Sequence, residues 1–266
     1  MTHPHVRAEI VSMLTISAIG LVLSGAVGCA SKEKTGTVAG PPLTIAPGTL
    51  PGGAYKKAGP ATIAFVDLTS VGTSVHLDGC QDVVVAVASG HANALEQELA
   101  AGDSVVDRTV TPVDIVVKGA GLAVVAAVGT KCASGAFPPP SRIAANRAQD
   151  LSWASGAMHA HLDIQDELRG DAYFGRLSGT AGVPEHAHEV STEIVIAIEA
   201  SGTLTIDGKP RRLAPRDVVA IPPATKHSWT PDPGSKLVAF QIYSPPGPEE
   251  RFKALAARAG SAPAAK

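Results

Sequence analysis

The sequence predicts an all-β protein built from many short strands. Its 266 residues include 27 glycines and 21 prolines, and few long stretches lack a turn-forming residue. Short runs of Val, Ile and Ala lie between these turns, which is typical of strands rather than long helices. Between Asp171 and Gly247 five such runs follow one another: DAYFGRL, EIVIAIE, GTLTIDG, DVVAIPP and KLVAFQIY. This series predicts an antiparallel meander or barrel.

The charge of the chain is nearly balanced, with 22 Lys and Arg against 24 Asp and Glu and a formal net charge of −2. A nucleic-acid-binding surface needs positive charge concentrated opposite the phosphates. The composition therefore argues against nucleic acid as a partner. An apolar content of 45% also argues against a chain that is disordered overall.

An uncharged apolar segment, Ile10–Gly28, ends directly at Cys29. Its length of about 19 residues is near the minimum for crossing a bilayer, so an uncleaved N-terminal anchor is one interpretation. The run AVGC resembles the lipobox of bacterial lipoproteins. That resemblance implies that residues 1–28 are a signal peptide and that Cys29 carries the lipid. It also implies a lipid-anchored location in the bacterial cell envelope, outside the cytoplasm, on the periplasmic or the surface face. Ala30 after the cysteine resembles the pattern sent to the outer membrane.

Residues 29–60 have the composition of a flexible tether. They contain SKEKTG, PP, PGTLPGG and GP, with no helical or strand period. About 30 residues of flexible coil reach roughly 30 Å root-mean-square, which is enough to hold a globular body away from a membrane surface.

Two cysteines, Cys80 and Cys132, remain beyond the proposed lipid-bearing one. Outside the cytoplasm such a pair indicates a disulfide, although two buried free thiols are the alternative. A metal-thiolate site is disfavoured, because neither cysteine has a CxxC partner or a nearby histidine cluster.

The most informative motif is EHAHEVSTE, within the series of short strands. His186 and His188 are two residues apart, so both imidazoles point to one face of a strand. A turn after them allows Glu193 to begin the neighbouring strand and point back at the pair. His227 follows on a further strand of the same barrel. Three imidazoles and one carboxylate on facing strands form a metal cage.

These residues resemble the first conserved motif of the cupin family, in which HxH is followed by Glu and then by Gly. His186, His188 and Glu193 match the motif, while Ala200 replaces its final glycine and Gly202 fills the glycine position that often follows. The resemblance implies a cupin-type double-stranded β-helix, or jelly-roll, barrel.

The second cupin motif is matched at Pro222 and His227. Arg216 and Ala224 stand where the motif has glycines, and Pro231 stands where it has asparagine. All four ligand positions are kept, so these departures concern turn geometry more than metal binding. Surface histidines on an ordinary barrel are the alternative interpretation.

The first half of the chain resembles the second. DVVVAVASG from Asp82 is similar to EIVIAIEASG from Glu193, and LAAGDSVV is similar to LAPRDVVA. We therefore expect two tandem barrels. The expected division is a degenerate cupin-like domain without a metal site at 61–136, a linker at 137–152, a metal-binding cupin domain at 153–252 and a C-terminal tail at 253–266.

In that alignment the N-terminal half lacks the ligands. Val75 and Leu77 replace the two histidines of HxH, and Val113 falls near the third histidine position. Only Asp82, opposite Glu193, could still coordinate.

A second HxH pair, His159 and His161, lacks a Glu at the motif spacing, so we expect a solvated strand edge there. Near the C-terminus, EERFKALAARA has apolar residues at helical spacing, which predicts a helix that packs against the barrel.

The expected ligand set suits one divalent transition metal ion, which could be Fe, Mn, Ni, Cu or Zn. Strand alternation makes four polar or aromatic residues candidates for lining a substrate pocket: Arg176, Trp229, Gln241 and Tyr243. Cupins with this ligand set include dioxygenases, isomerases and decarboxylases, so the resemblance implies chemistry on a small chelating, oxygen-rich substrate.

A non-enzymatic, metal-dependent module that binds or senses a small molecule is the alternative, since no separate general base stands out. A homodimer is also open, because cupins often pair through their sheets, although two units in one chain could satisfy that interface internally.

Overall fold

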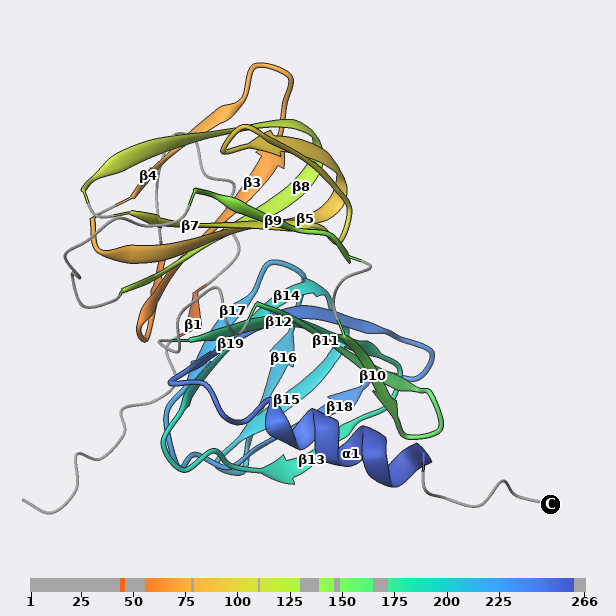
Figure 1. Ribbon diagram of the computed structural model, residues 1–266. Coiled ribbons are helices and arrows are strands. Elements are labelled where there is room, and N and C mark those ends of the chain that lie inside the picture. The colour runs from red at the N-terminus through yellow and green to blue at the C-terminus, as the bar shows by residue number, and fades with distance from the viewer. Residues whose placement is uncertain are drawn as a thin grey trace, which may run out of the picture. The chain divides into compact units, whose positions relative to one another are not determined.

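The computed structural model describes residues 44–45, 56–77, 79–109, 111–129, 139–145, 149–164 and 172–260, and almost every regular element among them is a strand (Figure 1). All described residues belong to one compact unit, 39–266. The all-β prediction is confirmed.

The N-terminal half is one bent sheet. Its strand order is β2-β3-β8-β5-β7-β9, with β4 also paired to β8 and β6 to β5. The strands are β2 (Lys56–Ala58), β3 (Ala61–Leu68), β4 (Thr73–Leu77), β5 (Gln81–Ala94), β6 (Gln97–Ala100), β7 (Ser104–Thr109), β8 (Val113–Gly129) and β9 (Ser141–Ile143).

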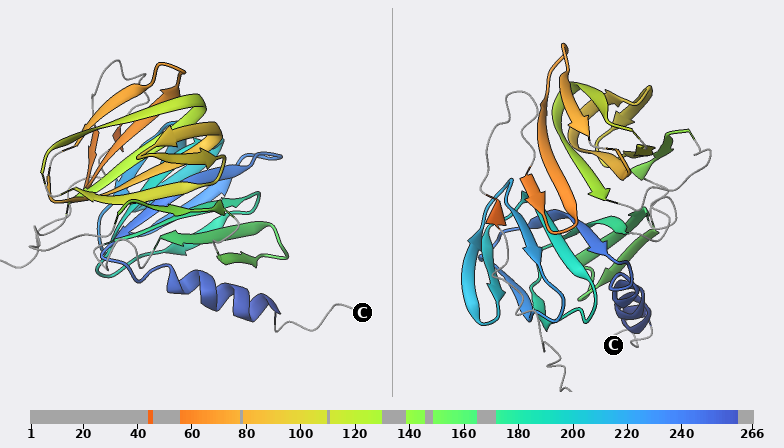
Figure 2. Two further views of the ribbon diagram at one scale, coloured as in Figure 1. Left: turned by 45° about the horizontal axis from the view of Figure 1, so that its top comes forward. Right: turned by 90° about the vertical axis from the view of Figure 1, so that its left-hand side faces the viewer.

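The C-terminal half is a sandwich of two sheets, β1-β17-β14-β19-β12-β11-β10 and β13-β18-β15-β16 (Figure 2). Its elements are β1 (Thr44–Ile45), β10 (Gln149–Trp153), β11 (Met158–Ile164), β12 (Tyr173–Gly179), β13 (Val183–His186), β14 (Thr192–Glu199), β15 (Gly202–Ile206), β16 (Lys209–Leu213), β17 (Val218–Ile221), β18 (His227–Pro231), β19 (Leu237–Ser244) and the helix α1 (Glu250–Gly260).

The two halves share one pairing scheme. The order β3-β8-β5-β7 in the first half is repeated as β12-β19-β14-β17 in the second. The remaining pairings correspond as well, because β4 and β6 flank the long strands β8 and β5 as β13 and β16 flank β18 and β15. This repeat supports the expectation of two cupin-like units.

In the first half, β5 and β8 are long strands that bend. Each pairs with the main sheet at one end and with a flanking strand, β6 or β4, at the other, and glycines allow the bend. The register between them shifts after Val87. A Cβ at Gly90 would lie 1.9 Å from the carbonyl oxygen of Ala120, and one at Gly119 would lie 2.1 Å from that of His91. No side chain fits in either space, so these two positions require glycine.

Three hydrophobic clusters hold the described part of the chain together. One fills the N-terminal barrel and another the C-terminal barrel. The third joins them: it includes Phe65 and Val84 from the first half with Phe174, Ile194 and Ile242 from the second. The outer face of the larger C-terminal sheet is therefore covered by the first half of the chain.

Three of the expected boundaries differ from the structure. The predicted C-terminal tail, 253–266, contains most of helix α1. The predicted tether, 29–60, contributes β1, which pairs with β17, and β2, which pairs with β3. The predicted linker, 137–152, contributes β9 to the N-terminal sheet and most of β10 to the C-terminal one. Short edge strands of this kind have little sequence pattern of their own, because an existing strand supplies their hydrogen bonds.

The departures from the second cupin motif leave the turns intact. Arg216 and Ala224, which stand where the motif has glycine, adopt positive φ values of 69° and 60°. In the first half, Gly102 occupies the position that matches Arg216 and has φ 88°. The backbone conformation is therefore kept without glycine. Arg216 in addition pairs with the carboxylate of Asp67, on β3.

Candidate metal centre

The four expected ligands come from both sheets of the C-terminal sandwich. His186 ends β13 and lies directly opposite His227, the first residue of β18. His188 follows in the turn after β13, and Glu193 lies in β14 of the other sheet. The turn expected after the histidines is present, but β14 does not pair with β13. Glu193 instead reaches the histidines from across the barrel.

One ligand atom of each residue lies within 4.8 Å of those of the others. The Nε2 atoms of His188 and His227 lie 3.0 Å and 2.8 Å from the Oε2 atom of Glu193. Metal bonds of about 2.0–2.2 Å place adjacent ligand atoms roughly 3 Å apart. The spacing of these side chains therefore fits a single ion between them.

Backbone carbonyls orient two of the imidazoles. Nδ1 of His186 donates to the carbonyl of Pro184 at 2.8 Å, and Nδ1 of His227 donates to that of Thr225 at 2.9 Å. Since a carbonyl only accepts, the proton is on Nδ1, and Nε2 carries the free lone pair. Nε2 of His227 is buried and has no partner with hydrogen-bond geometry. A metal ion satisfies such an atom.

Glu193 is almost fully buried, with 4% of its surface exposed. Gln241 donates from Nε2 to its Oε1 atom at 2.9 Å, which leaves Oε2 facing the histidines. Burial alone would raise the pKa of the carboxyl, but the contacts with His188 and His227 outweigh it and lower the pKa. Glu193 is therefore an ionised ligand.

Burial has different consequences for the neighbouring groups. It lowers the pKa of His186 to about 4, and the electrostatic effect of the neighbouring His227 acts in the same direction. His186 is thus neutral and able to bind a metal at physiological pH. Burial also raises the pKa of Tyr243 well above its ordinary value, so this phenol keeps its proton.

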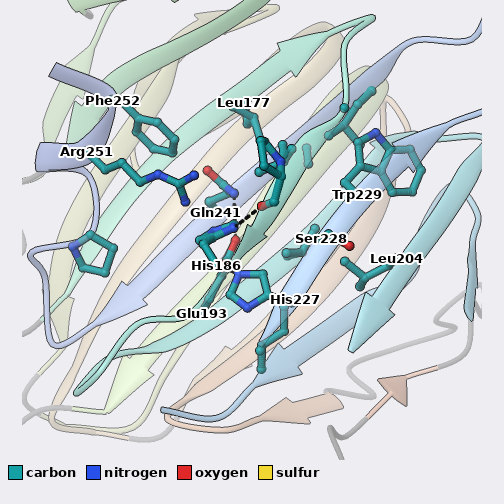
Figure 3. Close-up of a pocket in the computed structure, with 18 of the residues that line it drawn as sticks. Leu177, His186, Glu193, Leu204, His227, Ser228, Trp229, Gln241, Arg251 and Phe252 are labelled. Atoms are coloured by element: carbon teal, nitrogen blue, oxygen red, sulfur yellow. Dashed lines mark hydrogen bonds and ion pairs between the residues drawn. The ribbon is translucent and has the colours of Figure 1, made fainter. Parts of the chain in front are cut away.

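The ligands open onto a cavity of about 200 Å³ inside the C-terminal barrel (Figure 3). All four ligands line it. The rest of its wall is largely apolar and includes Leu177, Val195, Leu204, Ile221, Leu237 and Ala239.

Three of the four residues expected in the pocket line this cavity: Trp229, Gln241 and Tyr243. Arg176 does not. Its neighbour Leu177 faces the cavity, so Arg176 points to the other side of β12. One of its guanidinium nitrogens would lie 2.9 Å from a Cβ at Gly102 in the N-terminal half. The expectation for Arg176 was therefore wrong.

Helix α1 supplies cavity residues that the sequence analysis did not identify. Arg251, Phe252 and Leu255 line the cavity together with Pro248. The helical spacing of this segment predicted packing against the barrel, but nothing in it indicated that the packing closes one side of a metal cavity.

The second HxH pair lies on β11, away from this cavity. His159 contacts Asp150 on β10 at 3.2 Å and the carbonyl of Gly156 at 3.0 Å. His161 lies 3.9 Å from the same carboxylate. Among the described residues, only the cluster of His186, His188, Glu193 and His227 brings three or more ligand side chains close enough to hold a metal. The second HxH pair was expected at a strand edge, but the last strand of this sheet is β10, and β11 is the strand beside it.

The position of the carboxylate ligand is apolar in the N-terminal barrel. Val87 donates to the carbonyl of Asp103 as Ala197 donates to that of Asp217, so Val83, four residues before Val87, is the counterpart of Glu193 and packs in the N-terminal cluster. The expectation that Asp82 stands opposite Glu193 was therefore wrong: Asp82 is buried on the other face of β5. Arg108 binds both of its carboxylate oxygens, from Nε at 2.5 Å and from Nη2 at 3.1 Å. This charge pair therefore lies outside the position that matches the metal site.

The residues expected to replace the histidines are only partly those that do so. Val75 and Leu77 are buried, but Val113 is 39% exposed. Gly90 pairs with Gly121 as Gly202 pairs with Pro231. Four residues before Gly121 is Val117, as His227 precedes Pro231 by four, so Val117 is the counterpart of His227. Val117 pairs with Thr73 as His227 pairs with His186, so Thr73, and not Val75, is the counterpart of His186.

The remaining predicted sites fall mostly outside the described residues. Cys80 is disulfide-bonded, but its expected partner, Cys132, and the expected lipid-bearing Cys29 both lie outside the described part of the chain. Within the described residues, no helix has the length and hydropathy needed to cross a membrane.

Comparison with known proteins identifies the fold. Residues 176–239 match the cupin domain family. No curated protein sequence matches the chain. Among solved structures, an IolB-like protein from Salmonella typhimurium LT2 has a TM-score of 0.58 at 14% identity, over 77% of this chain and 93% of that one. A variant of oxalate decarboxylase from Bacillus subtilis has a TM-score of 0.52 at 10% identity, over 69% and 68%.

A further structure of the Bacillus subtilis enzyme, with the same TM-score and identity, is described through its Mn(II) centres. These likenesses concern the fold. Together with the two matched motifs and the ligand geometry, they identify the C-terminal barrel as a cupin domain with a site for a divalent transition metal ion.

Proposed function

We propose that the C-terminal barrel is a metal-dependent enzyme that acts on a small, oxygen-rich molecule able to chelate the ion, as an oxygenase, isomerase or decarboxylase. The observation that supports this most is the opening of the ligand cluster onto a cavity. Structural metal sites are closed by protein ligands, whereas catalytic sites leave positions open to a substrate. Here all four ligands line a space of about 200 Å³.

The protein groups around the ion have separate roles in this proposal. A bound divalent ion supplies Lewis acidity and, if it is redox-active, a place to bind dioxygen. Gln241 fixes the carboxylate of Glu193, and the carbonyls behind His186 and His227 fix the imidazoles. Tyr243 retains its proton and can donate a hydrogen bond to a substrate oxygen. The apolar walls exclude bulk water.

The first test is metal content. Purified wild-type protein should contain about one transition-metal ion per chain, and the double variant His186→Ala/His188→Ala should contain none by elemental analysis. The chain offers a matched control in its second HxH pair: His159→Ala/His161→Ala should keep the metal. Full occupancy in the first double variant would overturn the assignment of the site.

The second test is turnover. The metal-loaded protein should consume oxygen or convert at least one member of a panel of enediols, diketones and hydroxy acids, and the metal-free double variant should not.

A binding module that uses the metal without chemistry is the second candidate. The lining of the cavity supports this candidate. Apart from the metal ligands, the described residues of the wall include no carboxylate or imidazole that could act as a general base. Tight binding of a chelator from the panel without conversion would favour this candidate over the enzyme.

We also propose that the protein is attached to the bacterial cell envelope through a lipid on Cys29. The basis is the run AVGC after an apolar segment. Labelled palmitate should be incorporated into the wild-type protein and not into Cys29→Ala. Equal labelling of the two would exclude lipidation at this residue.

A homodimer stays a prediction, to be measured by light scattering.

A further inference from the structure

Helix α1 presents one face to the metal cavity. Its cavity-lining residues, with the proline before it, are Pro248, Arg251, Phe252 and Leu255, at positions i, i+3, i+4 and i+7. This spacing forms one stripe along a helix. Arg251 is the charged member of that stripe.

An aromatic contact fixes the helix in this orientation. The ring of Phe252 stacks on that of Trp153, with centroids 5.4 Å apart and planes inclined by 17°, and lies 6.4 Å from Tyr243. Phe252 is 8% exposed. Because Arg251 is adjacent to Phe252, this packing also fixes the position of the Arg251 backbone and Cβ atom.

The guanidinium of Arg251 extends from α1 toward the part of the cavity where Gln241, His186 and Glu193 lie (Figure 3). The side chain is half-buried, and no acidic residue in the described part of the chain forms an ion pair with it. The next cation in the helix, Lys253, is by contrast paired with Glu250.

The charges of the site call for a negative ligand. A divalent ion with neutral histidines and one carboxylate has a net charge of about +1, and Arg251 adds a further positive charge on the same cavity. Half-burying an unpaired cation beside a metal site is unfavourable unless an anion lies between them.

The rest of the cavity is suited to apolar atoms. Leu177, Leu204 and Leu237 line it, and Trp229 closes a further part. The volume of about 200 Å³ is below the range of about 300–1,000 Å³ typical of drug-sized ligands. The ligand is therefore small, with a charged end and an apolar end.

We infer that Arg251 is a specificity-determining residue that binds the carboxylate of a small substrate with an apolar side chain, in the class of 2-oxo and 2-hydroxy carboxylates. In this arrangement the 2-oxygen is available to the metal, while the planar guanidinium forms paired hydrogen bonds with the carboxylate. The inference rests on the proposed function of the metal site, and it adds the charge and shape of the substrate.

The test compares two probes of similar size on metal-loaded protein. The anionic probe is 4-methyl-2-oxopentanoate, and the neutral one is 5-methylhexane-2,3-dione, which keeps the chelating oxygens and the branched tail. Binding is measured by isothermal titration calorimetry for wild type, Arg251→Met, Arg251→Lys and the control Arg258→Met. Arg258 is on the same helix but exposed and away from the cavity.

We expect Arg251→Met to weaken binding of the anion roughly tenfold to a hundredfold, the range for losing a charge-assisted hydrogen bond. Binding of the dione should change less than about twofold by the same scale. Arg251→Lys should recover part of the loss, because it keeps the charge without the planar fork. Arg258→Met should match wild type with both probes.

Metal content is measured on every variant, so that the two proposals can fail separately. If the anion and the dione weaken equally in Arg251→Met while its metal content is normal, Arg251 does not select the carboxylate and the metal site stands. Loss of metal in Arg251→Met would make its role structural and overturn the inference. If wild type binds no metal, the proposed function itself is wrong, and the inference fails with it.

Discussion

Gln241 shows how much a single neutral side chain can contribute to a metal site. It is 4% exposed and donates to the Glu193 oxygen that faces away from the histidines. Groups that hold a ligand in this way typically affect metal affinity tenfold to a hundredfold when removed. We expect Gln241→Leu to weaken metal binding by about that factor, measured by competition with a chromophoric chelator.

The leucine fills a similar volume but leaves the carboxylate oxygen buried without a donor. Gln97→Leu, on β6 of the N-terminal barrel, is the matched control and should bind metal like wild type. Unchanged affinity in Gln241→Leu would mean that Glu193 needs no support from this amide.

At the residue scale, the sequence identified the ligands better than the pocket wall. The spacing of His186, His188 and Glu193 was sufficient to predict a common site. These residues are so close in sequence that few arrangements of short strands could place them far apart in space. The pocket wall depended on knowing which side of each strand is inside. Arg176 was assigned to the wrong side for that reason.

The same difficulty operates at the scale of the strand. In β12, Tyr173 packs in the C-terminal barrel and Phe174 in the cluster shared by the two halves. Both faces of the strand are therefore buried, and the alternation of apolar and polar residues that normally marks the inner face is lost. Arg251 was missed for another reason: its role depends on where α1 packs, which spacing within the helix does not specify.

A buried ion pair between β5 and β7 provides a prediction about the stability of the N-terminal half. Asp82 and Arg108 have side chains that are 2% and 11% exposed, and they form a two-bond pair across these strands. Removing one partner of a buried pair typically costs about 3–5 kcal/mol, because the other charge remains uncompensated. We expect Arg108→Met to lower the free energy of unfolding by about that amount in urea denaturation.

The double variant Asp82→Leu/Arg108→Met should recover much of this loss, since an apolar pair of similar volume can replace a buried ion pair. A loss in the single variant of less than about 1 kcal/mol, the level of a surface pair, would show that the pair is effectively solvated.

At the scale of the whole molecule, the two barrels share one strand order and differ at the ligand positions. The N-terminal barrel keeps the strand order and has Val83, packed in its apolar cluster, at the position of Glu193. The C-terminal barrel keeps the ligands. The shared cluster of apolar residues covers the larger sheet of the metal-binding barrel, so the first half of the chain supplies packing to the second.

That shared cluster predicts how metal affects stability. Because neither half can expose the cluster without cost to the other, we expect a single thermal transition for the folded part of the chain. A ligand present at 100 times its Kd stabilises the native state by about 2.7 kcal/mol. For a chain of this size that corresponds to a rise in Tm of about 5–10 °C.

Differential scanning calorimetry of apo and metal-loaded protein measures this rise. The variant His186→Ala/His188→Ala should show no response to metal, while His159→Ala/His161→Ala should respond like wild type. A metal-dependent shift of only one of two separate transitions would contradict the coupling of the barrels. In that case the metal would stabilise the C-terminal barrel alone, and the apolar contact between the halves would be too weak to make them unfold together.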